Sequence, residues 1–110
     1  LSLKNAKNRN KKYSSFEYDS SNRVIQRNSI KLRLTEKENQ ILNHLIENQN
    51  TYISKASLLN HIWNYNDKID THTLETHIYS LRKKIEKKIK IKNLIIYKEK
   101  KGYLVNKTYV

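Results

Sequence analysis

The chain has 110 residues, 36% of them hydrophobic and 30% charged, a length that fits one domain with a small core. Its formal net charge of +13 points to an anionic partner, most often nucleic acid. The absence of cysteine excludes disulfides and thiolate metal sites, and every apolar run in the sequence is too short to span a membrane.

The charge is concentrated at the two ends of the chain. Residues 1–15 have a net charge of +5, residues 16–70 are neutral, and residues 71–110 have a net charge of +8. This distribution is typical of a surface that binds nucleic acid and, less often, of one that binds an anionic membrane. Residues 1–15 are also polar and without periodicity. We therefore predict a basic flexible linker or tail over 1–15 and one domain over 16–110.

Short stretches of alternating apolar and polar residues between Phe16 and Leu34 predict antiparallel strands. They are "FEY", "RVIQ" and "SIKLRL", separated by the turn-like "DSSN" and "RN". The alternation is clearest at Ile30, Leu32 and Leu34.

Three amphipathic helices should follow these strands. The first begins after Thr35, where "TEKE" is a capping box completed by Glu38. "TYI" (51–53) predicts one brief strand, and Ser54 is a candidate cap for the second helix. Their predicted buried faces are Ile41, Leu42, Leu45 and Ile46 in the first helix, and Leu58, Leu59, Ile62 and Trp63 in the second.

The third helix, "THTLETHIYSLRKKIEKK", begins at a cap provided by Asp70 or Thr71. Its buried stripe is Leu74, Ile78, Leu81 and Ile85. The opposite stripe contains no acid: it consists of Thr73, Thr76, Ser80, Lys83 and Lys87, flanked by His72 and Tyr79. A solvated face usually mixes both signs of charge, so this bias favours a helix that reads the DNA major groove over a merely solubilising face.

The segment "NLIIYKEKKGYLV" predicts a strand, a turn with the only glycine, Gly102, and a second strand. The tip of this hairpin, Lys98–Lys101, is basic apart from Glu99. Strands, three helices and a terminal hairpin predict an α+β winged helix-turn-helix fold.

The stretches "LRLTEKENQIL", "ISKASLLNHIW", "DTHTLETHIYSLRKKI" and "GYLV" resemble the C-terminal effector domain of OmpR/PhoB-type response regulators over about residues 16–107. The resemblance implies an antiparallel four-stranded N-terminal sheet, three helices and a hairpin wing that approaches the minor groove. It further implies a bacterial, cytoplasmic transcription regulator of a two-component phosphorelay. Such a regulator binds double-stranded DNA at direct repeats as a dimer. The resemblance also implies a receiver domain and a cognate histidine kinase outside this chain. The chain lacks methionine, so we interpret it as a fragment of a longer protein.

Carried over position by position, the resemblance implies DNA contacts from the third helix, the second helix and the wing. The DNA-binding candidates are Lys55, Trp63, His72, Thr73, Thr76, His77, Tyr79, Ser80, Arg82, Lys83, Lys87, Lys98, Lys100 and Lys101. A core role for Trp63 is an equal alternative. The loop formed by Asn64, Tyr65, Asn66, Asp67 and Lys68 matches a segment that touches RNA polymerase in some family members.

Several residues depart from the family pattern. His72 and Ser80 stand where Arg is common, and Asn39 replaces an aromatic core residue. Glu99 stands at the wing position where an Arg often enters the minor groove, and Lys100 replaces a usual Gly. The loss of two guanidinium groups from the helix removes bidentate guanine readers. We therefore expect an operator unlike those of better-known members, for example an A/T-rich one.

Other site chemistries have less support. His72 and His77 are five residues apart and diverge on a helix, so "HTLETH" does not match a zinc signature, and we predict no metal or cofactor. His44 and His61 are predicted to be helix-surface residues. No phosphate loop or nucleophile motif occurs, so we predict no enzyme, and Glu75 and Glu86 are placed as structural partners of Arg82.

Two functions from other classes stay open. One is a basic RNA-binding or nucleoid-coating module without an operator. The other is a protein-interaction winged helix whose basic ends bind an acidic partner or a membrane surface. The membrane version is the weaker, because the apolar face of "KKIEKKIKIK" consists of isoleucine alone.

Overall fold

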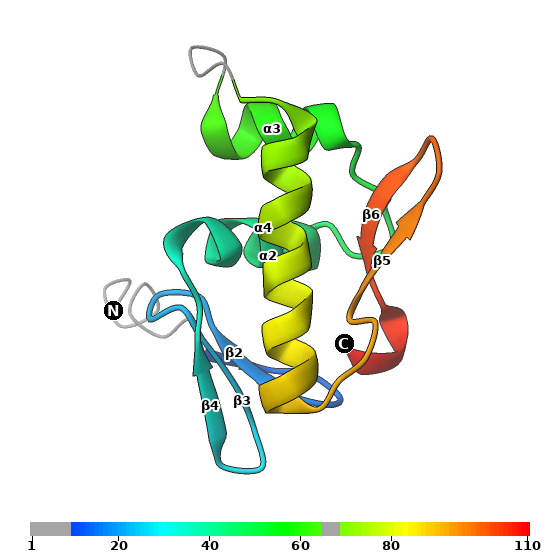
Figure 1. Ribbon diagram of the computed structural model, residues 1–110. Coiled ribbons are helices and arrows are strands. Elements are labelled where there is room, and N and C mark those ends of the chain that lie inside the picture. The colour runs from blue at the N-terminus through cyan, green and yellow to red at the C-terminus, as the bar shows by residue number, and fades with distance from the viewer. Residues whose placement is uncertain (1–9, 65–68) are drawn as a thin grey trace, which may run out of the picture.

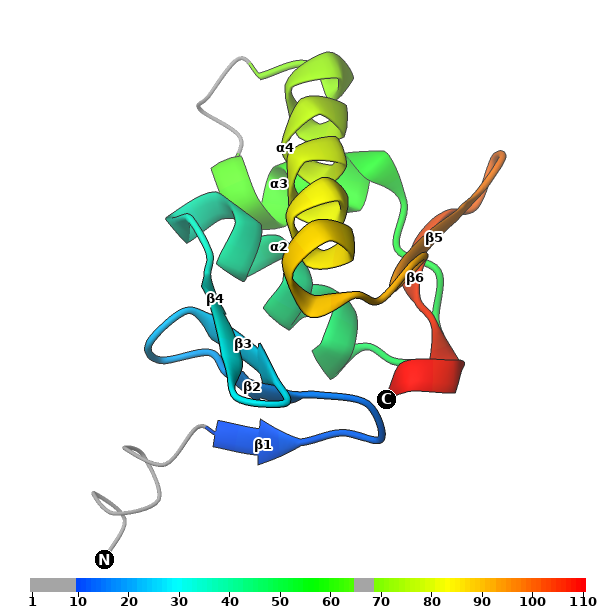
Figure 2. The same cartoon turned by 60° about the horizontal axis from the view of Figure 1, so that its bottom comes forward.

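The N-terminal part of the chain forms an antiparallel sheet of four strands in sequence order. The computed structural model describes residues 10–64 and 69–110. Its first sheet contains β1 (Asn10–Lys12), β2 (Glu17–Asp19), β3 (Val24–Arg27) and β4 (Ile30–Arg33), and lies below the helices in Figure 2. Tyr18, Ile25 and Leu32 are paired across β2, β3 and β4 and are all buried, so they form the core face of the sheet.

The strand β1 corrects the expected linker over residues 1–15. Its three side chains are exposed, so the strand forms by backbone pairing with β2 and not by burying apolar groups. The next residues also belong to the fold, since the ring of Tyr13 stacks on Phe16 with centroids 5.1 Å apart. The domain therefore includes residues 10–15, and the remainder of the expected linker, 1–9, lies outside the described residues.

Three helices follow, as predicted: α2 (Glu36–Glu47), α3 (Lys55–Trp63) and α4 (Thr71–Lys84). The Thr35 capping box is present, with Thr35 Oγ1 accepting from the Glu38 amide at 3.2 Å and Glu38 Oε1 accepting from the Thr35 amide at 2.9 Å. Ser54 caps α3 by accepting from the Ser57 amide at 3.1 Å. Within the described residues, no helix has the length and apolar character that crossing a membrane requires.

The helix α4 continues into a π-helical turn, η1 (Ile85–Ile89), that ends against the sheet. Arg27 of β3 donates hydrogen bonds to the carbonyls of Ile89 and Lys90, at 3.2 and 3.0 Å. The last carbonyls of a helix have no partner inside the helix. Arg27, a residue of the N-terminal sheet, therefore caps the C-terminal end of this helix.

The core confirms most of the predicted buried faces. All four predicted residues of α2 and all four of the α4 stripe are buried, as are Leu58, Ile62 and Trp63, while Leu59 is only partly buried. Ile30 differs from the expected alternation, because it starts β4 at the turn and leaves 45% of its surface exposed. Tyr18 reaches α2, where its hydroxyl hydrogen-bonds to Asn39, so a polar contact replaces the family's aromatic packing.

The C-terminal hairpin consists of β5 (Ile95–Lys98) and β6 (Gly102–Val105), followed by a short 3₁₀ turn, η2 (Lys107–Tyr109). The predicted brief strand at 51–53 is reduced to one bridge, in which Ile53 and Tyr103 exchange backbone hydrogen bonds. Gly102 has a φ of +111°, and a Cβ there would lie 2.1 Å from the Ile53 carbonyl oxygen. Only glycine allows this close approach of the hairpin to the segment before α3.

The elements together form the predicted winged helix-turn-helix. In Figure 1, α4 passes in front of α2 and α3, with the β5–β6 hairpin standing to one side of it. No other element lies in front of α4 in that view. The arrangement leaves one long face of the third helix open beside the wing.

Candidate nucleic-acid interface

The start of α4 is fixed by Asp70, which is the cap rather than Thr71. Asp70 Oδ1 accepts hydrogen bonds from the amide and the hydroxyl of Thr73, at 3.0 and 3.2 Å. The bond from the Thr73 amide contributes most to lowering the pKa of Asp70 below its ordinary value. The cap is thus an anion at a helix N-terminus, where the helix dipole favours negative charge.

The open side of α4 carries an exposed stripe of hydrogen-bonding and basic groups. It consists of His72, Thr76, Tyr79 and Lys83 on α4 and Lys87 on η1, all exposed. Neither lysine takes part in an ion pair among the described residues. The stripe therefore offers positive charge that the rest of this part of the chain does not neutralise.

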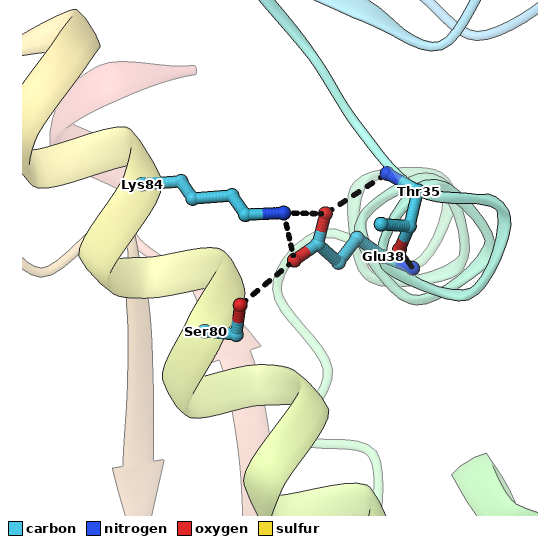
Figure 3. A network of polar contacts seen from close by, with 4 residues as sticks. All are labelled: Thr35, Glu38, Ser80 and Lys84. Atoms are coloured by element: carbon cyan, nitrogen blue, oxygen red, sulfur yellow. Dashed lines mark hydrogen bonds and ion pairs between the residues drawn. The ribbon is translucent and has the colours of Figure 1, made fainter.

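Ser80 does not belong to the exposed stripe, although it was predicted to contact DNA. Its hydroxyl donates a 3.1 Å hydrogen bond to Glu38 Oε2 on α2. The Nζ of Lys84 lies 3.0 Å from both carboxylate oxygens of the same Glu38. Figure 3 shows both side chains pointing from α4 toward this carboxylate. We name this set of Thr35, Glu38, Ser80 and Lys84 the α2–α4 clasp.

The clasp keeps Glu38 ionised although its side chain is 2% exposed. Burial by itself raises the pKa of Glu38, but the hydrogen bonds from the Thr35 amide, Lys84 and Ser80 outweigh it. The net result is a pKa below the ordinary value. A buried carboxylate with this many donors fixes the orientation of α4 on α2.

The hydroxyls of the two threonine candidates on α4 have local partners. Thr73 donates to Asp70 within the cap, and Thr76 Oγ1 donates to the His72 carbonyl at 3.0 Å. Such back-bonding uses the hydroxyl proton and leaves oxygen lone pairs that can still accept a hydrogen bond. Their predicted DNA contacts remain predictions.

Lys55 is paired within the chain and is not a free cation. Its Nζ lies 2.6 Å from Glu75 Oε2 on α4 and 4.9 Å from the ring centre of Tyr97 on β5. The hydrogen bond to Glu75 contributes most to raising the pKa of Lys55. Lys55 therefore connects α3, α4 and the wing. Glu75 competes with a DNA phosphate for the Lys55 ammonium, which was predicted to contact that phosphate.

Trp63 is 7% exposed and lies in the core between α2 and α4. Lys37 Nζ lies 5.2 Å from its ring centre, and the His77 ring is 5.3 Å away on the other helix. This burial favours the core role over the predicted contact with the DNA backbone. The half-buried His77 keeps its place beside the exposed stripe, supported by the indole.

Arg82 corrects a predicted ion pair. Its guanidinium donates to Asn93 Oδ1 at 3.2 Å, and it forms no ion pair with Glu75 or Glu86. Asn93 precedes β5, so Arg82 joins the wing side of α4 to the base of the hairpin. Its predicted DNA contact depends on the donors that this bond leaves unused.

The wing exposes the four charged residues of its tip: Lys98, Glu99, Lys100 and Lys101. Lys101 Nζ lies 5.8 Å from the ring centre of Tyr52, and its amide closes the turn by donating to the Lys98 carbonyl at 3.0 Å. Lys100 has a φ of +68°, a conformation that glycine adopts more readily. Three lysines thus surround Glu99.

The loop predicted to touch RNA polymerase is described only at Asn64, which ends α3 with a φ of +53° and is exposed. Tyr65, Asn66, Asp67 and Lys68 lie outside the described residues. In the remaining chain, no three His, Asp or Glu side chains converge as metal ligands would. His61 is exposed and His44 is half-buried, as expected of helix-surface residues, and their rings stack between α2 and α3 with centroids 3.9 Å apart.

Sequence patterns missed the residues that hold the interface together across elements. Glu38 was identified as a cap, but its bonds to Ser80 and Lys84 span 42 and 46 positions. Glu75 and Asn93 were also missed as partners of Lys55 and Arg82. No local signal in the sequence marks these partners, because each bond joins residues from different elements.

Comparison with known proteins agrees with this architecture. Residues 19–105 match the family described as "Transcriptional regulatory protein, C terminal". Response regulator ArlR of Staphylococcus aureus is 34% identical over 59 residues, which make up 54% of this chain and 27% of ArlR. The match therefore spans about a quarter of that relative's length.

Two solved structures have the same fold. The DNA-binding domain of response regulator AdeR, solved in complex with an intercistronic region, is 27% identical with a TM-score of 0.74, covering 87% of this chain and 98% of that one. The OmpR/PhoB homolog DrrB of Thermotoga maritima is 22% identical with a TM-score of 0.75, covering 94% of this chain and 47% of that one, and shows the fold alone. The chain thus belongs to the family of C-terminal domains of transcriptional regulatory proteins, of the OmpR/PhoB type that its motifs resemble.

Proposed function

We propose that the chain binds double-stranded DNA sequence-specifically, as the effector domain of a two-component response regulator. The observation that carries this proposal is the exposed stripe of α4, a basic helix face that no other described element covers. The AdeR domain, whose structure contains an intercistronic region, supports the same use of this fold.

In the proposed complex, α4 lies in the major groove, which is about 12 Å wide and admits one helix. His72, Thr76, Tyr79 and Lys83 then face base edges or phosphates. The wing lies on the adjacent backbone and minor groove, where Lys98, Lys100 and Lys101 offset the charge of Glu99. The α2–α4 clasp and the Lys55–Glu75 pair keep α4 and the wing in a fixed relation while the helix is inserted.

The wider assembly is also a proposal. By analogy with its family, the domain binds a direct-repeat operator as a dimer, contacts RNA polymerase through the loop at 64–68, and works in the cytoplasm without enzymatic activity of its own. A receiver domain phosphorylated by a histidine kinase would control the pairing. Each of these partners lies outside the present chain.

The proposal is tested by selection from a randomised duplex pool at about 0.15 M salt, a physiological ionic strength. We expect enrichment of two similar half-sites in direct repeat, about one helical turn apart. With about five phosphates neutralised, the logarithm of the affinity should fall with the logarithm of salt at a slope of about −4 to −5.

The same experiment distinguishes the alternatives. Salt-sensitive binding without any enriched sequence would indicate a basic coating module and would contradict the operator. An affinity that hardly depends on salt would contradict the electrostatic part of the proposal. Lys83→Gln, which removes a charge from the exposed stripe, should weaken DNA binding. Lys11→Gln is its matched control and should not, because β1 lies on the side of the sheet away from α4 (Figure 2).

A further inference from the structure

The largest side chain of the exposed stripe is an aromatic ring. Tyr79 leaves 63% of its surface exposed, more than Ile30 at 45% and Tyr97 at 40%. A single exposed tyrosine is ordinary on a protein surface, and exposure alone indicates no function. The position of Tyr79, halfway along the exposed stripe that we propose enters the major groove, is what makes it informative.

The contacts of its neighbours fix where this ring can go. Ser80 and Lys84 hold one flank of α4 to Glu38, and Arg82 holds the other flank to Asn93. A helix tied on both flanks cannot rotate about its axis to turn Tyr79 away from the groove. Among the described residues, the Tyr79 ring contacts Lys83, one turn along the helix, whose Nζ lies 5.6 Å from the ring centre.

The chemistry of the ring selects a particular group on the base pair. In the major groove, thymine differs from the other bases by its C5-methyl group, which proteins read by apolar contact. A lysine reads guanine or phosphate, and a threonine hydroxyl can bond to any base. The methyl group of Thr76 can also contact a thymine methyl group, but it offers a much smaller apolar surface than the Tyr79 ring. Tyr79 is the one residue of the stripe with an extended apolar surface that can cover a methyl group.

We propose that Tyr79 is a specificity-determining residue that reads the C5-methyl group of a thymine in each half-site. This inference rests on the proposed function and adds the identity of a recognised base. It concerns the face of the ring, not the hydroxyl. The Lys83 ammonium over the ring brings a positive charge close to the adjacent phosphate or guanine.

The test replaces each thymine of the selected operator, one at a time, by deoxyuridine, which removes the methyl group alone. For the wild type, we expect the Kd to rise about 4-fold at one thymine of each half-site, the effect of exposing one buried methyl group. Tyr79→Ala should bind more weakly and lose the distinction at that position. Tyr79→Phe should keep it, because the ring remains.

Two variants control the experiment. Ile30→Ala removes an exposed apolar side chain from β4, outside the stripe and the wing, and should retain the full uridine penalty. Circular dichroism of Tyr79→Ala should match the wild type, since the side chain is outside the core. A uniform loss of binding in Tyr79→Phe would instead assign the hydroxyl to a phosphate and overturn the inference.

The failure of this inference is distinguishable from that of the proposed function. A specific operator whose thymines can all be replaced without loss would overturn the role of Tyr79 and leave the operator function intact. Absence of any enriched operator would overturn both.

Discussion

The carboxylate of Glu38 on α2 lies 3.0 Å from the Nζ of Lys84 at the end of α4. Glu38 is almost completely buried and lies where two helices cross (Figure 3). Glu38→Gln keeps the shape but removes the charge that Lys84, Ser80 and the Thr35 amide stabilise. We expect it to lower the free energy of unfolding by about 1–3 kcal/mol, measured by urea denaturation at pH 7.

The pH dependence of this difference follows from the lowered pKa of Glu38. The stabilisation is complete above the ordinary value of 4.5 and is lost as the pH falls through the folded-state pKa. The gap between wild type and Glu38→Gln should therefore close in acid. The exposed Glu36 provides the control: Glu36→Gln should change stability by less than about 0.5 kcal/mol. Equal effects of the two variants would contradict a role for the clasp.

Two substitutions in the hairpin should change the stability of the domain in opposite directions. Gly102→Ala would place a Cβ 2.1 Å from the Ile53 carbonyl oxygen at a φ of +111°, and should destabilise the domain by at least about 2 kcal/mol. Lys100→Gly relieves a side chain held at a φ of +68°, and should stabilise by up to about 1 kcal/mol. Urea midpoints that move in the same direction would show that backbone strain does not control this turn.

The pairing of Lys55 with Glu75 makes a prediction about DNA affinity. Glu75→Gln removes an anion from the proposed interface and frees Lys55 to contact a phosphate. One additional phosphate contact should strengthen binding to every duplex about 5-fold at 0.15 M salt and steepen the salt slope by about 0.9. Fluorescence anisotropy over a salt series measures both quantities.

Lys55→Gln is the matched variant. Because the charge of Lys55 is already balanced by Glu75, this change should cost less affinity than Lys83→Gln. If Glu75→Gln leaves the affinity and the slope unchanged, Lys55 does not reach the DNA backbone.

The stacked His44 and His61 predict a dependence of stability on mild acid. Burial contributes most to lowering the pKa of His44, followed by the charge of His61, while Glu47 on α2 opposes them. The unfolded chain then takes up a proton near the ordinary value of 6.5, before the folded chain does. The free energy of unfolding should therefore fall as the pH drops below about 6.5.

His44→Phe retains a ring for stacking but cannot titrate, so it should lose the part of this pH dependence that comes from His44. His72→Gln, at an exposed position of α4, should keep the dependence of the wild type. Urea denaturation at several pH values provides the measurement. A wild type that becomes more stable in this range would contradict the lowered pKa of His44.

Local signals in the sequence predicted the features that depend on local physics. The capping box at Thr35, the apolar periodicity of Leu74, Ile78 and Leu81, and the single glycine of the hairpin each reside within a few residues. Such signals predicted all three helices and the wing. The family followed from the resemblance of four sequence stretches to its members, and not from these local signals.

The remaining features depend on contacts between distant elements. The strand β1 has exposed polar side chains throughout and forms through its backbone alone, so no hydrophobic pattern reveals it. Ser80 lies on the edge of the outer stripe, and only the position of α2 turns it toward Glu38. The same is true of Lys55, which a sequence pattern cannot distinguish from a cation free to bind phosphate.

The bond from Arg27 to the carbonyls of Ile89 and Lys90 has a consequence for how the domain opens. A helix with a solvated end frays there first, at little cost in free energy. Here the end of η1 cannot fray without breaking contacts to β3. Amide hydrogens at the C-terminal end of α4 and in β3 should therefore exchange with solvent in a single cooperative opening. The proposed reading helix and the N-terminal sheet should then show the same exchange rate.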